Sequence, residues 1–328
     1  MISAEPFRAL PKIDLHRHLE GSIRFETLRE LAAEVGLRLS VPVLRRCATM
    51  AGQRPGFRRF LSKFEIYRGL YPSREWIERV AFEAAEDARR DGVVHLELRF
   101  SPAHLGLRLR ARGEDVAEWV AGAARRAMPG VCFIATLARH RSLEANGPTF
   151  RAVEGTDVFS ALDIAGDERF SALPFLPFVR RVGLPVTIHA GEAGGAEHVR
   201  EAIEVFGAAR IGHGVRILED PRVVGLARRR GVVFECCPTS EILTGAARSW
   251  RRHPIPLMMR KGLRVTLNTD DPSICGVVLS GELARGIRCG LSRADLRRAT
   301  LEAAAAAFLP RPGRLLLKRK ILSAWSRT

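Results

Sequence analysis

The stretch KIDLHRH at residues 12–18 joins a short, mostly apolar run to two histidines. Its alternating apolar residues and the turn signals around it predict a buried β-strand over residues 12–16. A second run, PVTIH at residues 185–189, has the same form and also ends in histidine. Each run is followed by a longer segment with helical periodicity, and this alternation of strand and helix favours parallel pairing of the strands.

Eight such runs occur along the chain. We expect strands at residues 12–16, 93–100, 131–138, 158–164, 185–189, 210–212, 232–236 and 264–268. Amphipathic helices are expected between them, at residues 77–90, 116–128, 197–206, 221–230 and 255–260. A closed (β/α)8 barrel needs eight strand–helix units, whereas an open doubly wound sheet usually has fewer strands. The sequence therefore predicts an α/β protein with a (β/α)8 TIM barrel.

Two segments differ from this repeating pattern. Residues 17–92 are far longer than the dozen or so residues that a crossover needs. Helical patterns within them lie at residues 24–34, 57–70 and 73–90. They predict a helical cap inserted after the first strand, within about residues 22–92. Residues 139–156 have only weak helical periodicity, so the third unit is the least regular. No linker-like stretch divides the chain, which we expect to form a single domain over residues 1–328.

The C-terminal part and the overall charge also carry information. Ser292 and Asp295 have the spacing of a capping box and predict a helix that continues to Phe308. Residues 311–328 form a basic, amphipathic tail. With 53 Lys and Arg against 36 Asp and Glu, the formal charge is +17. Such a charge indicates either a nucleic-acid or acidic-membrane partner or a compositional preference for arginine, and we favour the second explanation.

No feature of the sequence indicates a secreted or membrane protein. Residues 1–15 lack the basic and apolar regions of a signal peptide, and no apolar run is long enough to span a bilayer. The six cysteines show no CxxC spacing, which indicates free thiols in a reducing compartment. We therefore expect a cytoplasmic protein without a membrane partner.

Histidines and acidic residues gather at the ends of the expected strands. They are His16 and His18 at the first strand, His189 at the fifth, His213 after the sixth, and Asp270 and Asp271 after the eighth. Side chains two positions apart, as in an HxH pair, share one face of a strand. Because the carboxyl ends of barrel strands share one face, where active sites are built, we expect these side chains to meet.

Three imidazoles and a carboxylate are donors that suit Zn²⁺, and a bound zinc ion makes water a nucleophile near neutral pH. The group therefore predicts a hydrolytic site with one Zn²⁺ ion. Each residue alone could be only a hydrogen-bonding group or a helix cap, but the four histidines and Asp270, all similarly placed, favour a metal site. We interpret the remaining histidines as structural or solvent-exposed; they are His95, His104, His140, His198 and His253.

Four blocks of sequence resemble the signature of the adenosine/AMP deaminase family. They are PKIDLHRHLEG at residues 11–21, HAGE at 189–192, RIGHG at 210–214 and NTDDP at 268–272. Bacterial members of the family also have stretches similar to residues 96–102, 163–168 and 237–240. The resemblance covers roughly residues 8–310. It implies a zinc-dependent amidohydrolase barrel that converts a 6-aminopurine into its 6-oxo form with release of ammonia.

The resemblance also implies roles for individual residues. The metal ligands would be His16, His18, His189 and Asp270. Glu192 would protonate ring N1 while activated water attacks C6, and burial would raise the pKa of Glu192 so that it carries the proton. His213 would orient and deprotonate the water and stabilise charge on its oxygen. Asp271 would face N7, and the backbone N–H of Gly166 would donate to N3.

Two positions depart from the family pattern. Adenosine deaminases usually have Asp, which meets the ribose 5′-hydroxyl, where this chain has Glu20. Relatives that act on adenine or aminodeoxyfutalosine often have Glu there, and we expect Glu20 and His18 to border the substrate. Glu241 stands where Asn or Ser is usual after CPTS. It could repel an anionic substrate, pair with an arginine such as Arg248, or be a solvated acid at a helix start.

Three hypotheses remain. The first is deamination of a 6-aminopurine nucleoside, adenosine foremost, with adenine or 6-aminodeoxyfutalosine as the alternative substrate. The second keeps the barrel and metal but hydrolyses an amide, lactone or phosphotriester, and it is disfavoured because no lysine lies at a strand end to bridge two metals. The third is an inactive barrel that binds nucleic acid through its arginines. With 7% aromatic residues and no recognised motif, we expect no nucleic-acid partner.

Overall fold

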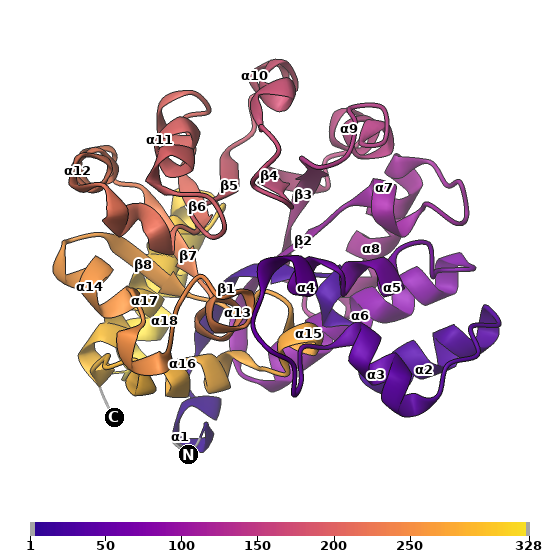
Figure 1. Cartoon of the computed structure of the whole chain (residues 1–328), viewed down its shortest axis with the longest axis horizontal. Helices are drawn as coiled ribbons and strands as arrows, with labels where there is room; N and C mark the ends of the chain where they lie inside the picture. The colour runs from indigo at the N-terminus through magenta and orange to yellow at the C-terminus, as the bar shows by residue number, and fades with distance from the viewer. Residues whose placement is uncertain (1–3, 326–328) are drawn as a thin grey trace.

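The eight expected strands form one parallel sheet that curves into a barrel (Figure 1). The computed structural model describes residues 4–325, so the two ends of the expected domain, residues 1–3 and 326–328, lie outside the described residues. The strands are β1 (Lys12–His18), β2 (Val93–Phe100), β3 (Cys132–Ala138), β4 (Phe159–Ala165), β5 (Val186–Ala190), β6 (Arg210–His213), β7 (Val233–Cys236) and β8 (Arg264–Leu267). They pair in sequence order, which confirms the predicted (β/α)8 barrel.

Residues just after β8 close the barrel against β1. The Asp270 N–H donates to the His16 carbonyl at 2.8 Å, and the His18 N–H donates to the Asp270 carbonyl at 2.8 Å. The Asn268 side chain accepts from the Leu15 N–H at 3.0 Å. Because β1 continues through these contacts to His18, it is two residues longer than expected, and His18 lies within the strand and not past its end. The other strand boundaries lie within one residue of the prediction.

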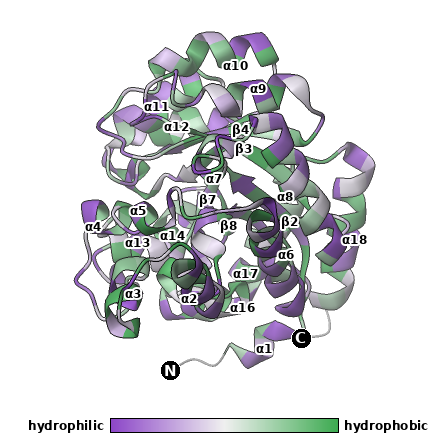
Figure 2. Cartoon of the chain, turned by 90° about the vertical axis from the view of Figure 1, so that its right-hand side faces the viewer, coloured by the Kyte–Doolittle hydropathy of each residue, from purple (hydrophilic) through white to green (hydrophobic). Residues whose placement is uncertain are grey.

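Helices surround the barrel. The α-helices are α1 (Glu5–Arg8), α2 (Phe25–Glu34), α3 (Val41–Ala48), α4 (Phe57–Leu61), α5 (Phe64–Tyr67), α6 (Arg74–Arg90), α7 (Pro102–Leu105), α8 (Gly113–Ala127), α9 (Gly147–Gly155), α10 (Leu176–Val182), α11 (Ala196–Glu204), α12 (Pro221–Arg230), α13 (Pro238–Thr244), α14 (Ile255–Arg260), α15 (Pro272–Cys275), α16 (Leu279–Arg288), α17 (Arg293–Ala306) and α18 (Arg311–Trp325). Single 3-10 turns are η1 (Glu20–Ser22), η2 (Leu173–Phe175), η3 (Val215–Glu219) and η4 (Trp250–Arg252). In Figure 2 the outer helices carry both hydrophobic and hydrophilic bands, as expected where one face packs on the barrel.

The structure differs from the predicted helices at a few points. The segment expected to be one helix over residues 57–70 forms two short helices, α4 and α5. Helix α3 was not predicted, because Val41 and Val43 are exposed and hide the helical period of its sequence. The weakly periodic third unit does contain a helix, α9. The capping box at Ser292 and Asp295 is present and begins α17, as predicted.

The elements between β1 and β2 extend across one end of the barrel. Helix α6 packs on the outer helix α8, whereas α4 packs on α13, which follows β7. Figures 1 and 2 both show α4 beside α13. The insertion after the first strand therefore touches loops from the far side of the barrel, next to the carboxyl ends of the strands.

The tail forms helix α18, whose buried side chains include Leu317, Ile321 and Trp325. The Trp325 indole N–H donates to the Pro11 carbonyl at 3.1 Å, just before β1. The basic tail expected over residues 311–328 is thus a packed helix as far as Trp325, and its last three residues lie outside the described part. Among residues 4–325, no helix has the length and apolar character needed to cross a membrane.

Candidate active site

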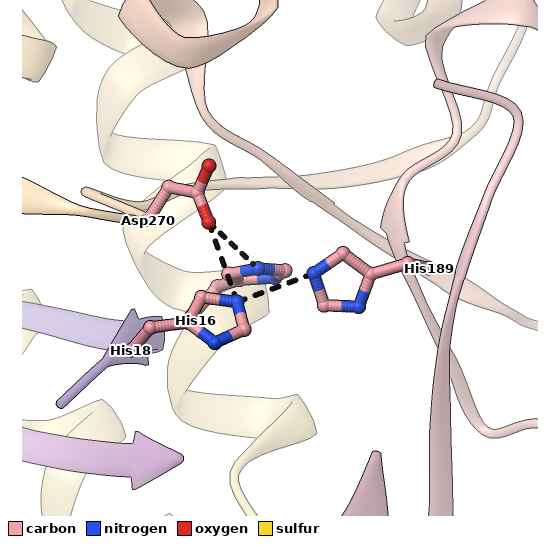
Figure 3. Close-up of side chains that lie close together, drawn as sticks. All are labelled: His16, His18, His189 and Asp270. Atoms are coloured by element: carbon pink, nitrogen blue, oxygen red, sulfur yellow. Dashed lines mark hydrogen bonds and ion pairs between the residues drawn. The ribbon is translucent and has the colours of Figure 1, made fainter. Parts of the chain in front are cut away.

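Four side chains from three strand ends converge inside the barrel (Figure 3). They are His16 and His18 on β1, His189 on β5, and Asp270 after β8. The Asp270 Oδ1 atom lies 3.2 Å from His16 Nε2 and 3.5 Å from His18 Nε2. The Nε2 atoms of His18 and His189 are 3.2 Å apart. All four donor atoms lie within 4.8 Å of one another, and all four residues are buried.

Buried carboxylates hold the outer nitrogens of two of these rings. His16 Nδ1 lies 2.7 Å from Glu235, and His189 Nδ1 lies 3.0 Å from Asp163. Arg99 donates to both carboxylates, at 2.8 Å to Glu235 and 3.2 Å to Asp163. Although burial opposes ionisation, Arg99 holds the pKa of Glu235 well below its usual range. Each Nδ1 therefore carries the proton, which leaves the Nε2 lone pair directed at the cluster.

This arrangement fits a metal ion. The Nε2 atom of His16 is buried without a hydrogen-bond partner among the described residues. It faces the Asp270 carboxylate at 3.2 Å, so two electron-rich atoms oppose each other. A cation between such atoms removes their repulsion, and imidazole with carboxylate suits a divalent transition metal or zinc.

Glu192 and His213 lie beside this cluster. His213 Nε2 is 3.7 Å from Glu192 and 3.9 Å from Asp270. Burial raises the pKa of Glu192 to about 8, against the opposing charge of His213. Burial lowers the pKa of His213, but the carboxylates around it, Glu192 first, outweigh this effect and raise the pKa to about 10. Buried Glu168 accepts the N–H groups of Glu192 at 3.1 Å and of Gly194, and so fixes the loop that carries Glu192.

Glu241 is neither a solvated acid nor a partner of Arg248, and it is not among the residues that line the cavity. The side chain is fully buried, with an oxygen 3.4 Å from His213 Nδ1 and the other 3.2 Å from His253 Nε2. It also accepts the Cys237 N–H at 2.9 Å. Burial alone would raise the pKa of Glu241, but hydrogen bonds from the two histidines lower it to about 2. All three interpretations of Glu241 are therefore wrong, because its partners come from segments that do not share a local pattern.

A cavity of about 530 Å³ opens from the cluster. Glu20, Gly166 and Asp271 line it together with Glu192 and His213. Burial raises the pKa of Glu20 to about 7, and its Oε1 accepts the Ser101 N–H at 2.8 Å. The backbone of Gly166 has φ +99°, and a Cβ there would lie 2.2 Å from His140 Nδ1, so only glycine fits.

The adenosine deaminase family model matches residues 11–324 of this chain. The adenosine deaminase of Serratia proteamaculans (strain 568) is 34% identical over 328 residues, which cover 95% of this chain and 98% of that protein. The chain belongs to the adenosine deaminase family. The family resemblance of its four sequence blocks is thereby confirmed.

Solved structures share the fold of this family member. An amidohydrolase from Burkholderia ambifaria with bound Zn superposes with a TM-score of 0.88 at 22% identity, over 99% of this chain and 93% of that one. The adenine deaminase of Arthrobacter aurescens superposes with a TM-score of 0.88 at 22% identity, over 98% of this chain and 100% of that one.

Several residues of this deaminase-family cavity were not predicted. His104 and His140, expected to be structural or exposed, line the cavity, as do Arg68 and Arg141. His253 is buried against Glu241. These residues follow short helices or strands from different units, so no single stretch of sequence brings them together. Asp163 and Glu235 were also missed, although an acid inside an otherwise apolar strand is a usable signal for a buried partner.

Proposed function

We propose that this family member catalyses zinc-dependent hydrolytic deamination of a 6-aminopurine nucleoside, with adenosine as the first candidate. One observation carries the proposal. A buried carboxyl group with a raised pKa, Glu192, lies in the same cavity as the His and Asp cluster. Addition of water at C6 of a purine pushes an electron pair onto N1, and a buried protonated carboxyl group can supply the proton that this ring nitrogen requires.

One zinc ion would be held by His16, His18, His189 and Asp270. When bound, zinc supplies the positive charge that lowers the pKa of water toward neutrality. Its positive charge would also oppose the effect of the carboxylates on the pKa of His213. Three neutral imidazoles and one carboxylate match the preferences of zinc better than those of magnesium or calcium.

The chain's own residues would then perform the proton transfers. Glu192, protonated at neutral pH, would donate its proton to N1 as water adds at C6. One proton of the water would pass through His213 to the amino group, which leaves C6 as ammonia. The other proton would return to Glu192, while N1 keeps its proton in the 6-oxo product. His213 would orient that water through Nε2, because Glu241 holds its Nδ1 side. Asp271 would face N7 and the Gly166 N–H would donate to N3, which fixes the ring in the plane needed for attack. Proton transfer by a positioned group contributes typically about 10²–10⁴-fold to rate.

The substrate side of the site includes His18 and Glu20. Glu20 is held by the Ser101 N–H and borders the cavity where a sugar would follow the base. Adenine or 6-aminodeoxyfutalosine is the alternative substrate, because a glutamate here need not contact a ribose 5′-hydroxyl. The elements within residues 22–92 would act as a cap of the single domain, since α4 and α5 carry cavity residues such as Phe60 and Phe64. Free thiols at all six cysteines support a reducing location, the cytoplasm.

An absorbance assay tests the proposal. The metal-depleted and zinc-reconstituted protein would be given adenosine, deoxyadenosine, adenine and cytidine, with loss of the aminopurine band and release of ammonia measured in parallel. We expect zinc-dependent turnover of at least one aminopurine and none of cytidine. If no aminopurine reacts with the reconstituted enzyme, the proposal is wrong.

A further inference from the structure

The cavity changes character from its inner to its outer end. Its inner carboxyl groups are at most 7% exposed; they belong to Glu20, Glu192, Asp270 and Asp271. Its outer wall carries basic side chains, Arg68 after α5, His104 on α7, and His140 and Arg141 after β3. The arginines lie at the mouth, since the Arg141 side chain is 35% exposed and Arg68 is half-buried.

The positive charge at the mouth is poorly neutralised within the described structure. Among residues 4–325, the Arg68 guanidinium has no carboxylate within 4.0 Å. Arg141 pairs with Glu65 at 3.2 Å, but the Glu65 side chain is 65% exposed, and such pairs are weak. Asp167, the other acid on this wall, is engaged by Arg169.

The neighbouring histidines respond to this charge. Burial lowers the pKa of His104 to about 4, helped by the charges of Arg68 and Arg141. The pKa of His140 is also lowered, by burial and then by Arg141. Both rings are therefore neutral at pH 7, and the positive charge of the wall comes from the two arginines.

We propose that Arg68 and Arg141 form an anion subsite, so that the substrate is a 6-aminopurine nucleoside whose sugar carries a phosphate or carboxylate. This inference rests on the proposed deaminase function. The cavity of about 530 Å³ has room for such an extension, because a cavity of about 150 Å³ already holds a benzene ring. Positive charge at the outer end would orient the substrate, with its anion at the arginines and its base at the inner end beside Glu192.

Aromatic side chains connect the two ends. The ring centroid of Phe64 lies 6.4 Å from that of His18. The backbone N–H of Arg68 donates to the backbone carbonyl of Phe64 at 3.1 Å. Phe57 and Phe60 of α4 line the same cavity. The apolar wall between the metal cluster and the arginines suits the sugar and any apolar spacer. It also lowers the local dielectric constant, which strengthens a charge-assisted hydrogen bond between the arginines and the substrate anion.

The test compares kcat/KM for adenosine, adenosine 5′-monophosphate and a 5′-deoxyadenosine thioether with a terminal carboxylate. We expect at least one anionic substrate to exceed adenosine by roughly 10- to 100-fold, the range of one charge-assisted contact. The phosphate and carboxylate arms distinguish the two sources of charge.

Substitutions of Arg68 and Arg141 test whether these two residues cause the preference for anionic substrates. We expect Arg68→Gln and Arg141→Gln each to lower the ratio of anionic to neutral kcat/KM by about 10-fold. Glu65→Gln should raise this ratio, because it removes the carboxylate that pairs with Arg141. A variant that merely misfolds would not show such an increase. Arg108→Gln, at an exposed residue outside the cavity lining, is the matched control and should keep the ratio.

Calorimetric binding of inosine and inosine 5′-monophosphate separates the two proposals. If aminopurines do not react but the phosphorylated product analogue binds more tightly than inosine through Arg68, the subsite stands and the deaminase proposal fails. If adenosine reacts as well as both anionic substrates, and the arginine variants leave the ratio unchanged, the subsite is wrong and the deaminase proposal stands.

Discussion

At the residue scale, backbone strain marks the site. His213 and Asp270 both have φ of 61°, a left-handed conformation that non-glycine residues rarely adopt. Such a residue costs on the order of 1–3 kcal/mol unless its surroundings hold it. Asp270 is held by its backbone bonds to β1, and His213 by Glu241 and Glu192. The two residues thereby turn their side chains toward one cluster.

Glu192→Gln tests the proton donor directly. Gln keeps the size of the side chain but cannot donate a proton to N1, so we expect turnover to fall by about 10²–10⁴-fold. Metal content, measured by elemental analysis, should stay at the wild-type value because Glu192 is not one of the four ligands. Glu204→Gln, at an exposed residue of α11, is the control and should change neither quantity. Normal turnover in Glu192→Gln would remove this residue from the mechanism.

Glu241 should stabilise the fold as well as position His213. Its pKa is lowered from the ordinary 4.5 to about 2, so the ionised form stabilises the folded state above pH 4.5, and this contribution is lost as the pH falls toward 2. We expect Glu241→Gln to lower the free energy of unfolding at pH 7 by about 3 kcal/mol, with the difference from wild type shrinking below pH 4.5. Urea denaturation at several pH values measures this. Glu144→Gln, at an exposed residue, is the control, and an equal loss at every pH would contradict the assignment.

At the scale of elements, the sequence predicts which site residues lie at the strand ends but not which contacts form between the loops. His16, His189 and Asp270 could be found because each follows a recognisable apolar run, and the barrel brings all strand ends to one face. The convergence of Arg68 and Arg141 on the cavity could not be found, because they lie in loops of different units, and the contact of Glu241 with His253 joins two turns of the long loop between β7 and β8. Helix α5 is followed directly by Arg68, so the insertion after β1 supplies this part of the cavity wall.

Helix α18 is the element whose observed role differs most from the one that the sequence predicts. Its basic residues suggest a surface tail, yet Trp325 is 5% exposed and bonded to the Pro11 carbonyl. We expect Trp325→Ala to lower the free energy of unfolding by about 3 kcal/mol or more, the usual cost of removing a buried Trp. Leu316→Ala, at a side chain 68% exposed, should change it by less than about 0.5 kcal/mol. If the two variants unfold at the same urea concentration, α18 does not contribute to the core.

At the scale of the whole molecule, the arginines behind the charge of +17 lie in different settings, and Arg68 and Arg141 at the cavity mouth are only two of them. Arg17, Arg99, Arg139 and Arg210 are buried, and Arg99 and Arg210 neutralise the acids that hold the metal cluster. Others lie on outer helices, where Arg24 pairs with Glu86 and Asp87. The absence of a nucleic-acid partner stays a prediction, and the preference for arginine accounts for much of the charge.

Removal of the metal should destabilise the whole barrel, because the cluster joins β1 and β5 with the segment after β8. A ligand at 100 times its Kd stabilises the folded state by about 2.7 kcal/mol, and for a chain of 328 residues that corresponds to roughly 4 °C in Tm. We expect scanning calorimetry to show this loss after dialysis against a chelator. Zn²⁺ should restore the Tm and Mg²⁺ should not, since imidazole ligands suit zinc. His189→Gln, which removes one ligand, should abolish the response to zinc, whereas an exposed change such as Glu204→Gln should keep it. If neither the chelator nor added zinc changes the Tm, the cluster binds no ion. The hydrolytic mechanism would then lack its source of activated water.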